Sequence, residues 1–333
     1  MHQHPQTVAV VIVSYNTVGL LRCCLAKLAG STLPLRIVVV DNASTDGSTA
    51  MVRAEFPAVE LIALAANVGF ARGTNIGLAT LGLIASGGER QGGMPPPSDN
   101  ILILNPDTEV QPGAIESLVA FLAAHPRVGL VGPRLLNPDG TPQAAAFRFP
   151  TPLMTALDLF PPGEVLPGRL YGSWWHGRYP QERGERPFPI DHPLGACMLL
   201  RPEVIAQVGG LDEDYFMYSE EIAWCWRIRA AGWAIWQVPA ARVVHVGGAA
   251  TRQFRWRMLV ALYHSRARFA ATHYTPAQRL AHTVVVRAGM IRAVLRTWRG
   301  YARGRISRDE LRAHLLAYGE ISRSSLFAWP SKF

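Results

Sequence analysis

The chain has 333 residues, of which 49% are hydrophobic and 17% charged, so its length and composition suit a folded protein with a large core, arranged as one domain or two. The net formal charge is +9, but it is uneven: residues 251–333 carry 16 Lys and Arg against 3 Asp and Glu, and residues 1–250 carry 17 against 21. A near-neutral body with a strongly basic C-terminal segment suggests an anionic partner for that segment, while the lack of any run of about 18 apolar residues excludes a spanning helix.

Two further classes of protein are excluded by simple features of the sequence. The four cysteines form no CxxC pair, which argues against a zinc site or a disulfide framework and fits a reducing compartment. The N-terminus has no basic segment followed by an apolar one, so no signal peptide is expected.

Hydrophobic strands alternate with helical segments along the chain. Apolar runs at residues 8–13, 37–40, 59–64 and 101–104 predict buried strands, and apolar residues at helical spacing follow them. Further strands are predicted at 195–200, 234–238 and 243–246, and helices at 202–208 and 220–229. Strands that alternate with helices form a mostly parallel sheet with helices on both faces.

The strand at residues 101–104 runs directly into Asn105, Pro106 and Asp107. Pro106 has no N–H to donate, so the strand ends there and Asp107 lies just beyond its C-terminal end. Ligands bind at this edge of open α/β sheets, and a carboxylate there can hold a cation that in turn holds a diphosphate. For this motif alone, an ordinary turn aspartate remains the alternative.

Each of the first four predicted strands ends in small polar or acidic residues. They are Ser14, Tyr15 and Asn16 after the first, Asp41 and Asn42 after the second, Asn67 after the third, and Asn105 and Asp107 after the fourth. Because the carboxyl ends of parallel strands share one edge, these clusters should converge on one crevice. Any one of them could cap a helix instead, but four together favour a ligand crevice.

The helix predicted after the third strand carries Gly69, Gly73 and Gly77 on one face. Their spacing differs from GxGxxG, so it does not indicate a dinucleotide fold. Small residues on one face allow either a ligand or the sheet to come close. Arg72 lies one turn into this helix and could meet a phosphate.

The helix at 220–229 begins with Glu220 and Glu221, and Ser219 is a candidate N-cap. One acid in the first turn is enough for helix capping, so the second is available as a general base. A lone histidine such as His245, at the end of a later strand, is usually structural. It would be a metal or phosphate ligand only if the fold brings it back to Asp107.

These motifs resemble the family-2 inverting glycosyltransferases of the GT-A fold, and most of all their bacterial rhamnosyltransferase-like branch. The matching stretches lie at residues 11–16, 39–48, 67–77, 104–108 and 218–227, in the order of the family. The resemblance implies a Rossmann-like, mostly parallel sheet with helices on both faces. We therefore expect a GT-A catalytic domain over residues 1–250 and a basic, helical C-terminal extension over residues 251–333.

The resemblance also implies a donor site. Ser14, Tyr15 and Asn16 would line the nucleotide pocket, and Asp41 would hydrogen-bond the base. Other donor contacts are expected from Asn42, Asn67, Arg72, Asn75 and Asn105. Asp107 would ligate Mg²⁺ or Mn²⁺, with the diphosphate holding much of the ion. From its position alone, His245 is the second candidate metal ligand.

The implied catalytic base is Glu221, with Glu220, Trp226 and Arg227 in the vicinity of the donor and acceptor. A carboxylate there would take the proton of the acceptor hydroxyl in a single displacement that inverts the anomeric centre. With an ordinary glutamate pKa of about 4.3, Glu221 should be ionised at neutral pH. Ala223 stands where many relatives have a second aspartate, which puts an acceptor contact in question.

The implied function is metal-dependent transfer of a sugar from a nucleotide-diphosphate donor to a hydroxyl of a glycan or lipid-linked acceptor, in cell-surface polysaccharide synthesis. The branch suggests L-rhamnose as the sugar. A catalytically weak nucleotide-sugar-binding or scaffold protein stays open as an alternative because of Ala223. A nucleotidyltransferase is the other, although no Lys-rich or Gly-rich triphosphate loop follows the first strand.

The basic extension contains an amphipathic pattern. Val284, Ala288, Ile291, Leu295 and Trp298 share one helix face, beside the arginines Arg292, Arg296, Arg299 and Arg303. Such a helix suits the surface of an anionic bilayer, or it packs on the catalytic domain with a solvated charged face. Because no recognisable nucleic-acid-binding motif accompanies this charge, nucleic acid is not expected as a partner. We expect a cytoplasmic protein at the inner face of the plasma membrane, and a homodimer is compatible with the sequence.

Overall fold

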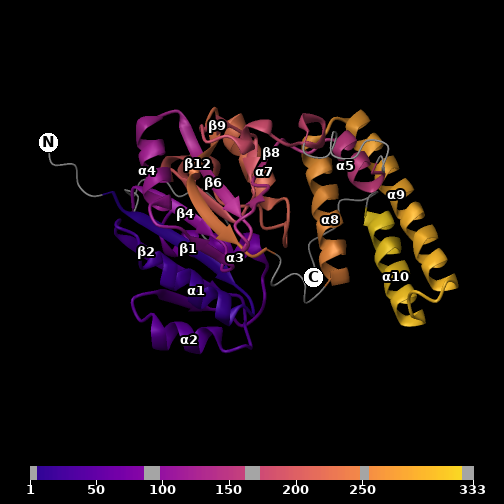
Figure 1. Cartoon of the computed structure of the whole chain (residues 1–333), viewed down its shortest axis with the longest axis horizontal. Helices are drawn as coiled ribbons and strands as arrows, with labels where there is room; N and C mark the ends of the chain where they lie inside the picture. The colour runs from indigo at the N-terminus through magenta and orange to yellow at the C-terminus, as the bar shows by residue number, and fades with distance from the viewer. Residues whose placement is uncertain (1–5, 86–97, 162–172, 248–254, 325–333) are drawn as a thin grey trace. The chain divides into compact units, whose positions relative to one another are not determined.

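The computed structural model describes residues 6–85, 98–161, 173–247 and 255–324 (Figure 1). The chain forms two compact units. The first contains Met1–Arg148, Tyr179–Glu213 and Glu220–Ala250, and the second contains Phe149–Arg178, Asp214–Ser219 and Thr251–Phe333. The second unit thus takes in two segments that precede residue 250, the single boundary predicted from the sequence.

One sheet forms the centre of the first unit. Across it the strands are β3 (Glu60–Ala63), β2 (Leu35–Asp41), β1 (Val8–Ser14), β4 (Asn100–Leu104), β11 (Cys197–Leu200), β6 (Val128–Leu136), β12 (Ala234–His245) and β5 (Thr108–Val110). The short strands β7 (Pro142–Gln143) and β9 (Phe188–Pro189) pair with β6 and β12, and β8 (Ala146–Phe147) pairs with β10 (His192–Pro193). Strands β3, β2, β1 and β4 are parallel, as are β6 and β12, whereas β11 and β5 are antiparallel to their neighbours. The predicted mostly parallel sheet is confirmed.

Helices cover both faces of this sheet, as expected. On one face, α1 (Val18–Leu28), α2 (Ser48–Glu55) and α4 (Ala114–Ala124) share a core with Val8, Val10 and Ile12 of β1. Figure 1 shows α1 and α2 beside β1 and β2. On the other face, α3 (Phe70–Thr80) packs on Val11 and Val13, the alternate residues of the same strand. The first unit also contains α6 (Pro202–Val208), α7 (Glu220–Ala230) and the 3₁₀ turn η3 (Pro180–Arg183).

The glycine stripe of α3 serves packing between helix and sheet. A Cβ atom at Gly73 would lie 2.9 Å from Val13 Cγ1, and one at Gly77 would lie 2.4 Å from Val11 Cγ1. Neither position has room for a side chain. The two glycines therefore let α3 approach β1 closely, which explains their spacing without a ligand.

We expect Gly77→Ala to lower the free energy of unfolding by about 1–3 kcal/mol, because the added methyl overlaps Val11 and overpacks the core. Gly19→Ala in α1 is the matched control, since nothing lies within 4 Å of its added Cβ. Alanine favours a helix over glycine by roughly 1 kcal/mol, so the control should be neutral or slightly stabilising. Urea unfolding of both variants measures the effect, and equal stability of the two would contradict the packing role.

One local prediction is wrong. Residues 234–238 and 243–246 belong to one strand, β12, rather than two; its register against β6 shifts between Val238 and Arg242, around Pro239, which cannot donate to the ladder. Ser219, the candidate N-cap, directly precedes α7 and has a φ of 63°, whereas N-cap residues are typically extended. Tyr218 before it also has a positive φ, of 69°.

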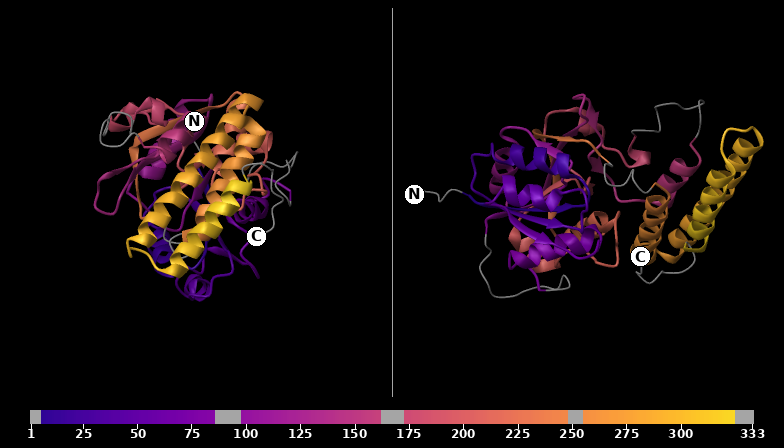
Figure 2. Two further views of the ribbon diagram at one scale, coloured as in Figure 1. Left: turned by 90° about the vertical axis from the view of Figure 1, so that its right-hand side faces the viewer. Right: turned by 90° about the horizontal axis from the view of Figure 1, so that it is seen from below.

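The second unit is helical, which confirms the helical C-terminal extension. It contains α5 (Pro152–Leu159), the 3₁₀ turn η2 (Trp174–His176), α8 (Arg255–His273), α9 (Pro276–Ala302) and α10 (Arg308–Ser324). Val260, Val286, Met290 and Ile321 from the last three helices form its core, and Figure 2 shows α9 and α10 side by side. In the part of the chain that the structure describes, no helix combines the length and apolar character that a membrane crossing needs.

Candidate functional site

The ends of β1 and β2 present a buried carboxylate. Ser14 and Asp41 are register partners at these ends, and Asp41 is 1% exposed. Its Oδ1 accepts a hydrogen bond of 2.8 Å from the backbone N–H of Ser44. Its Oδ2 is buried and has no hydrogen-bond partner among the described residues. A buried acceptor without a donor is costly, so this oxygen suits an N–H group of a ligand.

Asn16 joins the loops that follow these two strands. Its Oδ1 accepts from the backbone N–H of Thr45 at 2.8 Å, and its own N–H donates to Ser44 Oγ at 2.9 Å. It takes a left-handed conformation with φ of 50°, which asparagine tolerates better than most residues. The predicted nucleotide loop of Ser14, Tyr15 and Asn16 is thus held against the loop that follows Asp41.

Asn42 and Asn67 shape the turn that leads into α3. Asn42 is buried; its Nδ2 donates to Gly69 O at 3.1 Å and its Oδ1 accepts from the N–H of Val68 at 2.9 Å. Asn67 Oδ1 accepts from the N–H of Gly69 at 3.0 Å. Both side-chain amides therefore hydrogen-bond this turn. The sequence had predicted that these two residues contact the nucleotide-sugar donor.

Arg72 and Asn75 of α3 both meet Glu213 but differ in exposure. The Arg72 side chain is 60% exposed, with Nε 3.7 Å from Glu213 Oε2. Asn75 is 1% exposed; its Nδ2 donates to Leu211 O at 2.9 Å and to Glu213 Oε1 at 3.0 Å, and its Oδ1 accepts from Leu211 N at 2.8 Å. Arg72 is accessible to an anionic ligand, whereas the amide of Asn75 is used to hold the loop at 211–213.

Asp107 and His245 lie together although 138 positions separate them in the sequence. Strand β5 follows Asp107 and pairs with β12, in which His245 is the register partner of Thr108. The N–H of Val246 donates to the backbone oxygen of Asp107 at 3.0 Å. As a result His245 Nε2 lies 3.4 Å from Asp107 Oδ1, and both residues are mostly buried. The fold thus meets the condition under which the sequence made His245 a candidate ligand.

The donor atoms of this pair fit a small divalent cation. A carboxylate oxygen and an imidazole nitrogen are ligands that Mn²⁺ takes readily, and Mg²⁺ shares the preference for carboxylate. No group of three or more His, Cys, Asp or Glu residues in the described ranges could hold a metal ion. An ion at Asp107 would therefore take its remaining ligands from phosphate oxygens and water, as Mg²⁺ sites commonly do.

Glu220 and Glu221 begin α7 as a pair of shielded acids. Glu220 is 5% exposed, and the Oε2 atoms of both residues are buried without a hydrogen-bond partner in the described part of the chain. Burial raises the pKa of Glu221 to about 7, and burial together with the neighbouring Glu221 charge raises the pKa of Glu220 well above its ordinary value. The prediction that Glu221 is fully ionised at neutral pH is wrong, because it assumed a solvated carboxyl.

One short backbone segment joins the acids to the Asp107 motif. A Cβ atom at Gly195 would lie 3.2 Å from Glu221 Cγ, so the absence of a side chain there makes room for Glu221. The next residue, Ala196, accepts a hydrogen bond of 2.9 Å from the N–H of Asn105. A carboxyl of near-neutral pKa and the Asp107 motif are thus both in contact with the segment at Gly195 and Ala196.

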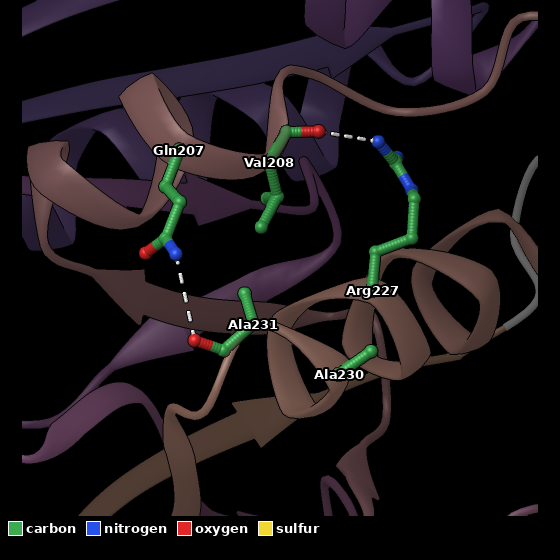
Figure 3. A pocket seen from close by; sticks show the side chains of 5 residues that line it. All are labelled: Gln207, Val208, Arg227, Ala230 and Ala231. Atoms are coloured by element: carbon green, nitrogen blue, oxygen red, sulfur yellow. Dashed lines mark hydrogen bonds between the residues drawn. The ribbon is translucent and has the colours of Figure 1, made fainter.

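The far end of α7 has a structural role. Arg227 donates to the backbone oxygens of Val208 at 2.6 Å and Gly210 at 2.5 Å and so supports that loop, while its place near the donor or acceptor stays a prediction. A hollow lined by Gln207, Val208, Arg227, Ala230 and Ala231 lies here (Figure 3). Its lining residues on α7 lie 7 to 10 positions after Glu220, about 10–15 Å along the helix, so it is not the site of the paired acids. Trp226 is half-buried, and Ala223, at the departure from the family pattern, is buried.

Sequence reasoning missed three residues that touch the site: Gln143, Gly195 and Glu213. Each of them contacts a residue far away in the sequence. Gln143 and His245, for example, are 102 positions apart. Gln143 lies among turn residues, and Gly195 lies at the start of the strand predicted at 195–200, so no local pattern could have shown these contacts.

Comparison with known proteins gives consistent matches. The profile of the family described as glycosyl transferase family 2 matches residues 9–209. The chain is 31% identical over 322 residues to an N-acetylglucosaminyl-diphospho-decaprenol L-rhamnosyltransferase of Mycobacterium tuberculosis, covering 95% of this chain and 94% of the relative. It is 27% identical over 241 residues to the low-salt glycan biosynthesis hexosyltransferase Agl10 of Haloferax volcanii, covering 71% and 66%.

Solved structures share the fold at low identity. The mannosyltransferase PcManGT from Pyrobaculum calidifontis, in complex with GDP-Man and Mn²⁺, superposes with a TM-score of 0.52 at 16% identity, covering 98% of this chain and 87% of that one. GalNAc-T7 with UDP, GalNAc and Mn²⁺ gives a TM-score of 0.55 at 14% identity, covering 95% and 55%. At these identities the likeness concerns the fold, which is that of the GT-A glycosyltransferases.

Proposed function

Because the chain belongs to glycosyl transferase family 2 and is a rhamnosyltransferase-like glycosyltransferase, we propose that it transfers L-rhamnose from deoxythymidine diphosphate-L-rhamnose to a sugar hydroxyl of a lipid-diphosphate-linked acceptor. The reaction is a single inverting displacement that depends on Mg²⁺ or Mn²⁺, and it serves cell-surface polysaccharide synthesis. The similarity to the mycobacterial rhamnosyltransferase over nearly the whole chain supports the sugar and the type of acceptor.

The observation that carries the mechanism is the frame linking Glu221, Gly195, Ala196 and Asn105 to the Asp107–His245 pair. Asp107 and His245 would hold the cation, which supplies neutralisation of the departing diphosphate. Asp41 Oδ2, which has no hydrogen-bond partner among the described residues, would accept a hydrogen bond from the nucleobase. The exposed guanidinium of Arg72 would contact the diphosphate or the sugar.

Glu221 is the proposed general base. A sugar hydroxyl is a weak nucleophile, and a carboxylate in contact with it takes the proton as the new bond forms. A base whose pKa lies near the working pH combines adequate ionisation with adequate basicity, which suits the pKa of about 7 at Glu221. Attack from the face opposite the diphosphate inverts the anomeric centre.

Thermal unfolding with a panel of nucleoside diphosphates and triphosphates, in Mn²⁺, Mg²⁺ or EDTA, tests the donor site. A ligand at about 100 times its Kd stabilises by roughly 2.7 kcal/mol, which gives a clear shift in Tm. Deoxythymidine diphosphate should stabilise with metal and much less with EDTA. Equal stabilisation in EDTA would contradict the metal site, and a preference for a nucleoside triphosphate would favour the nucleotidyltransferase alternative.

We expect kcat/KM at saturating metal ion to rise with pH through about pH 7, because this parameter reports ionisation in the free enzyme and Glu221 must be deprotonated to act. Stability should change in the opposite direction. The pKa of both acids in the folded protein lies above the value of 4.5 for an unperturbed glutamate, so the folded state holds their protons more tightly than the unfolded state. The stability that these protonated acids contribute is therefore complete below about pH 4.5 and is lost as the pH rises through about 7. A flat kcat/KM between about pH 6 and 8 would contradict the assignment.

We also propose that the second unit contacts an anionic membrane at the inner face of the plasma membrane, where a lipid-linked acceptor is held. Supporting this, Leu280, Val284, Ile291, Leu295 and Trp298 of α9 are all more than 45% exposed, and α9 contains no Asp or Glu. Arg296, Arg299 and Arg303 are exposed beside this apolar face. Arg292 departs from the predicted stripe, because its Nη1 donates to Leu159 O at 2.6 Å. A homodimer stays a prediction from the sequence.

Replacing Ile291, Leu295 and Trp298 together by serine should lower binding to phosphatidylglycerol-containing vesicles at least about tenfold, since each apolar side chain contributes roughly 1.5–3 kcal/mol on burial. Flotation measures this, with Leu153→Ser on α5 as control because Leu153 is 49% exposed outside α9. Point variants are preferable to removing residues 251–333, since Ser265 of α8 donates to Met217 O at 2.7 Å, just before α7. Flotation of the triple variant like wild type would contradict the proposal.

A further inference from the structure

Gln143 is a half-buried residue of β7 whose side chain reaches the ring of His245. Its Oε1 lies 2.7 Å from His245 Nδ1. An imidazole ring has one nitrogen that donates and one that accepts when it is neutral, and the partner of one nitrogen decides the state of the other. The orientation of the Gln143 amide therefore decides what His245 Nε2 can do.

That orientation is determined by acceptors on the other side of the amide. The nitrogen of Gln143, Nε2, lies 3.1 Å from Asn137 Oδ1 and 3.3 Å from the backbone oxygen of His245. Both neighbours accept hydrogen bonds, so the amide NH₂ must face them and the amide oxygen must face the ring. An amide oxygen can only accept, so His245 must carry a proton on Nδ1.

Asn137 is oriented in turn by the hairpin between β6 and β7. The Thr141 hydroxyl donates to Asp139 Oδ1 at 2.6 Å, and Asp139 also accepts from the Thr141 N–H at 2.9 Å. With its proton committed, Thr141 Oγ1 can only accept from Asn137 Nδ2, at 2.9 Å, which turns Asn137 Oδ1 toward Gln143. The hydrogen bond from Thr141 holds the pKa of Asp139 below its ordinary value, so this carboxylate remains an acceptor at neutral pH.

We propose that Gln143 is a positioning residue that fixes His245 in the tautomer protonated on Nδ1, so that the Nε2 lone pair faces Asp107 and is ready to bind the metal ion. The orientation of the Gln143 amide is determined by a chain of hydrogen bonds, the relay, that runs from Asp139 through Thr141 and Asn137 to Gln143. Histidines that ligate metals commonly donate their other N–H to a fixed acceptor, and losing such an acceptor weakens metal binding by about 10- to 100-fold. The inference rests on the proposed metal site at Asp107 and His245.

The tautomer is measured in the metal-free protein by long-range ¹H–¹⁵N correlation of the histidine rings, with His245→Asn identifying the His245 signals. At a pH at which the ring is neutral, wild type should show Nδ1 protonated and Nε2 unprotonated. Gln143→Leu, which has no acceptor, should lose this preference. Gln143→Glu keeps an acceptor for Nδ1 and should retain the Nδ1 proton, although it loses the two hydrogen bonds that the amide NH₂ donates. Gln207→Leu on α6 is the matched control and should leave the His245 signals unchanged.

Mn²⁺ affinity provides the second readout, with free Mn²⁺ followed by electron paramagnetic resonance. Gln143→Leu should bind Mn²⁺ about 10- to 100-fold more weakly than wild type, and Gln143→Glu, which keeps an acceptor for Nδ1, should bind more tightly than Gln143→Leu. An unchanged tautomer in Gln143→Leu, or protonation on Nε2 in wild type, would overturn the role of Gln143 even if Mn²⁺ binds. Failure of wild type to bind Mn²⁺, with the expected tautomers present, would instead overturn the metal site and the purpose of the relay.

Discussion

Glu221→Gln is expected to lower kcat by about 10²- to 10⁴-fold, the range that a positioned general base contributes. The amide keeps the shape of the side chain and its contact with Gly195 but cannot accept the acceptor's proton. Donor binding should remain, because the groups proposed to bind nucleotide and metal lie on other elements. The effect should therefore appear in kcat and leave nucleoside diphosphate affinity within a few-fold of wild type.

The variant should also be at least as stable as wild type, which separates a catalytic role from a structural one. Removing a buried ionisable group whose pKa is raised by burial removes a source of instability at neutral pH. Glu203→Gln, an exposed acid in the first turn of α6, is the control and should change neither rate nor stability. Near-normal turnover of folded Glu221→Gln would make the base assignment wrong.

Asp107→Asn is expected to reduce transfer on the order of a thousandfold, because a metal ion contributes several kcal/mol of transition-state stabilisation and each 1.36 kcal/mol is tenfold in rate. Asparagine is nearly isosteric but carries no charge, so the paired ligand His245 should hold Mn²⁺ weakly by itself. The stabilisation of the protein by deoxythymidine diphosphate should then no longer depend on metal.

Asp309→Asn, in the exposed first turn of α10, serves as the control for this change of charge. It should retain full transfer and a metal-dependent shift in Tm. If Asp107→Asn kept either property, the cation would have to be held elsewhere or be dispensable.

The sequence was most informative where regular patterns repeat. The apolar runs of β1, β2 and β4 are uninterrupted because both faces of these strands are buried, so periodicity located them and their polar ends marked one edge of the sheet. The same reasoning placed Asp107 at that edge. It did not distinguish ligand contact from packing at Gly73 and Gly77, because either needs a small residue there, and only the distance to β1 decides.

The parts that could not be predicted depend on contacts between distant segments. Antiparallel β11 lies between β4 and β6, and this insertion brings Gly195 and Ala196 beside the Asp107 motif. The raised pKa of Glu221 follows from burial, which no local pattern at the start of a helix reveals. The polar residues Asn42, Asn75 and Arg227 were assigned to ligands from the resemblance, but their hydrogen bonds support neighbouring loops.

The most direct test of the central claim is a transfer reaction followed by mass spectrometry. The purified chain is incubated with deoxythymidine diphosphate-L-rhamnose and a short-chain prenyl diphosphate carrying N-acetylglucosamine, with Mn²⁺ or with EDTA. We predict a product larger by one deoxyhexose in Mn²⁺, no product in EDTA, and about a thousandfold less product from Asp107→Asn. Undiminished transfer in EDTA would contradict metal-dependent catalysis, and a wild type that binds the donor but makes no product would favour the binding or scaffold alternative.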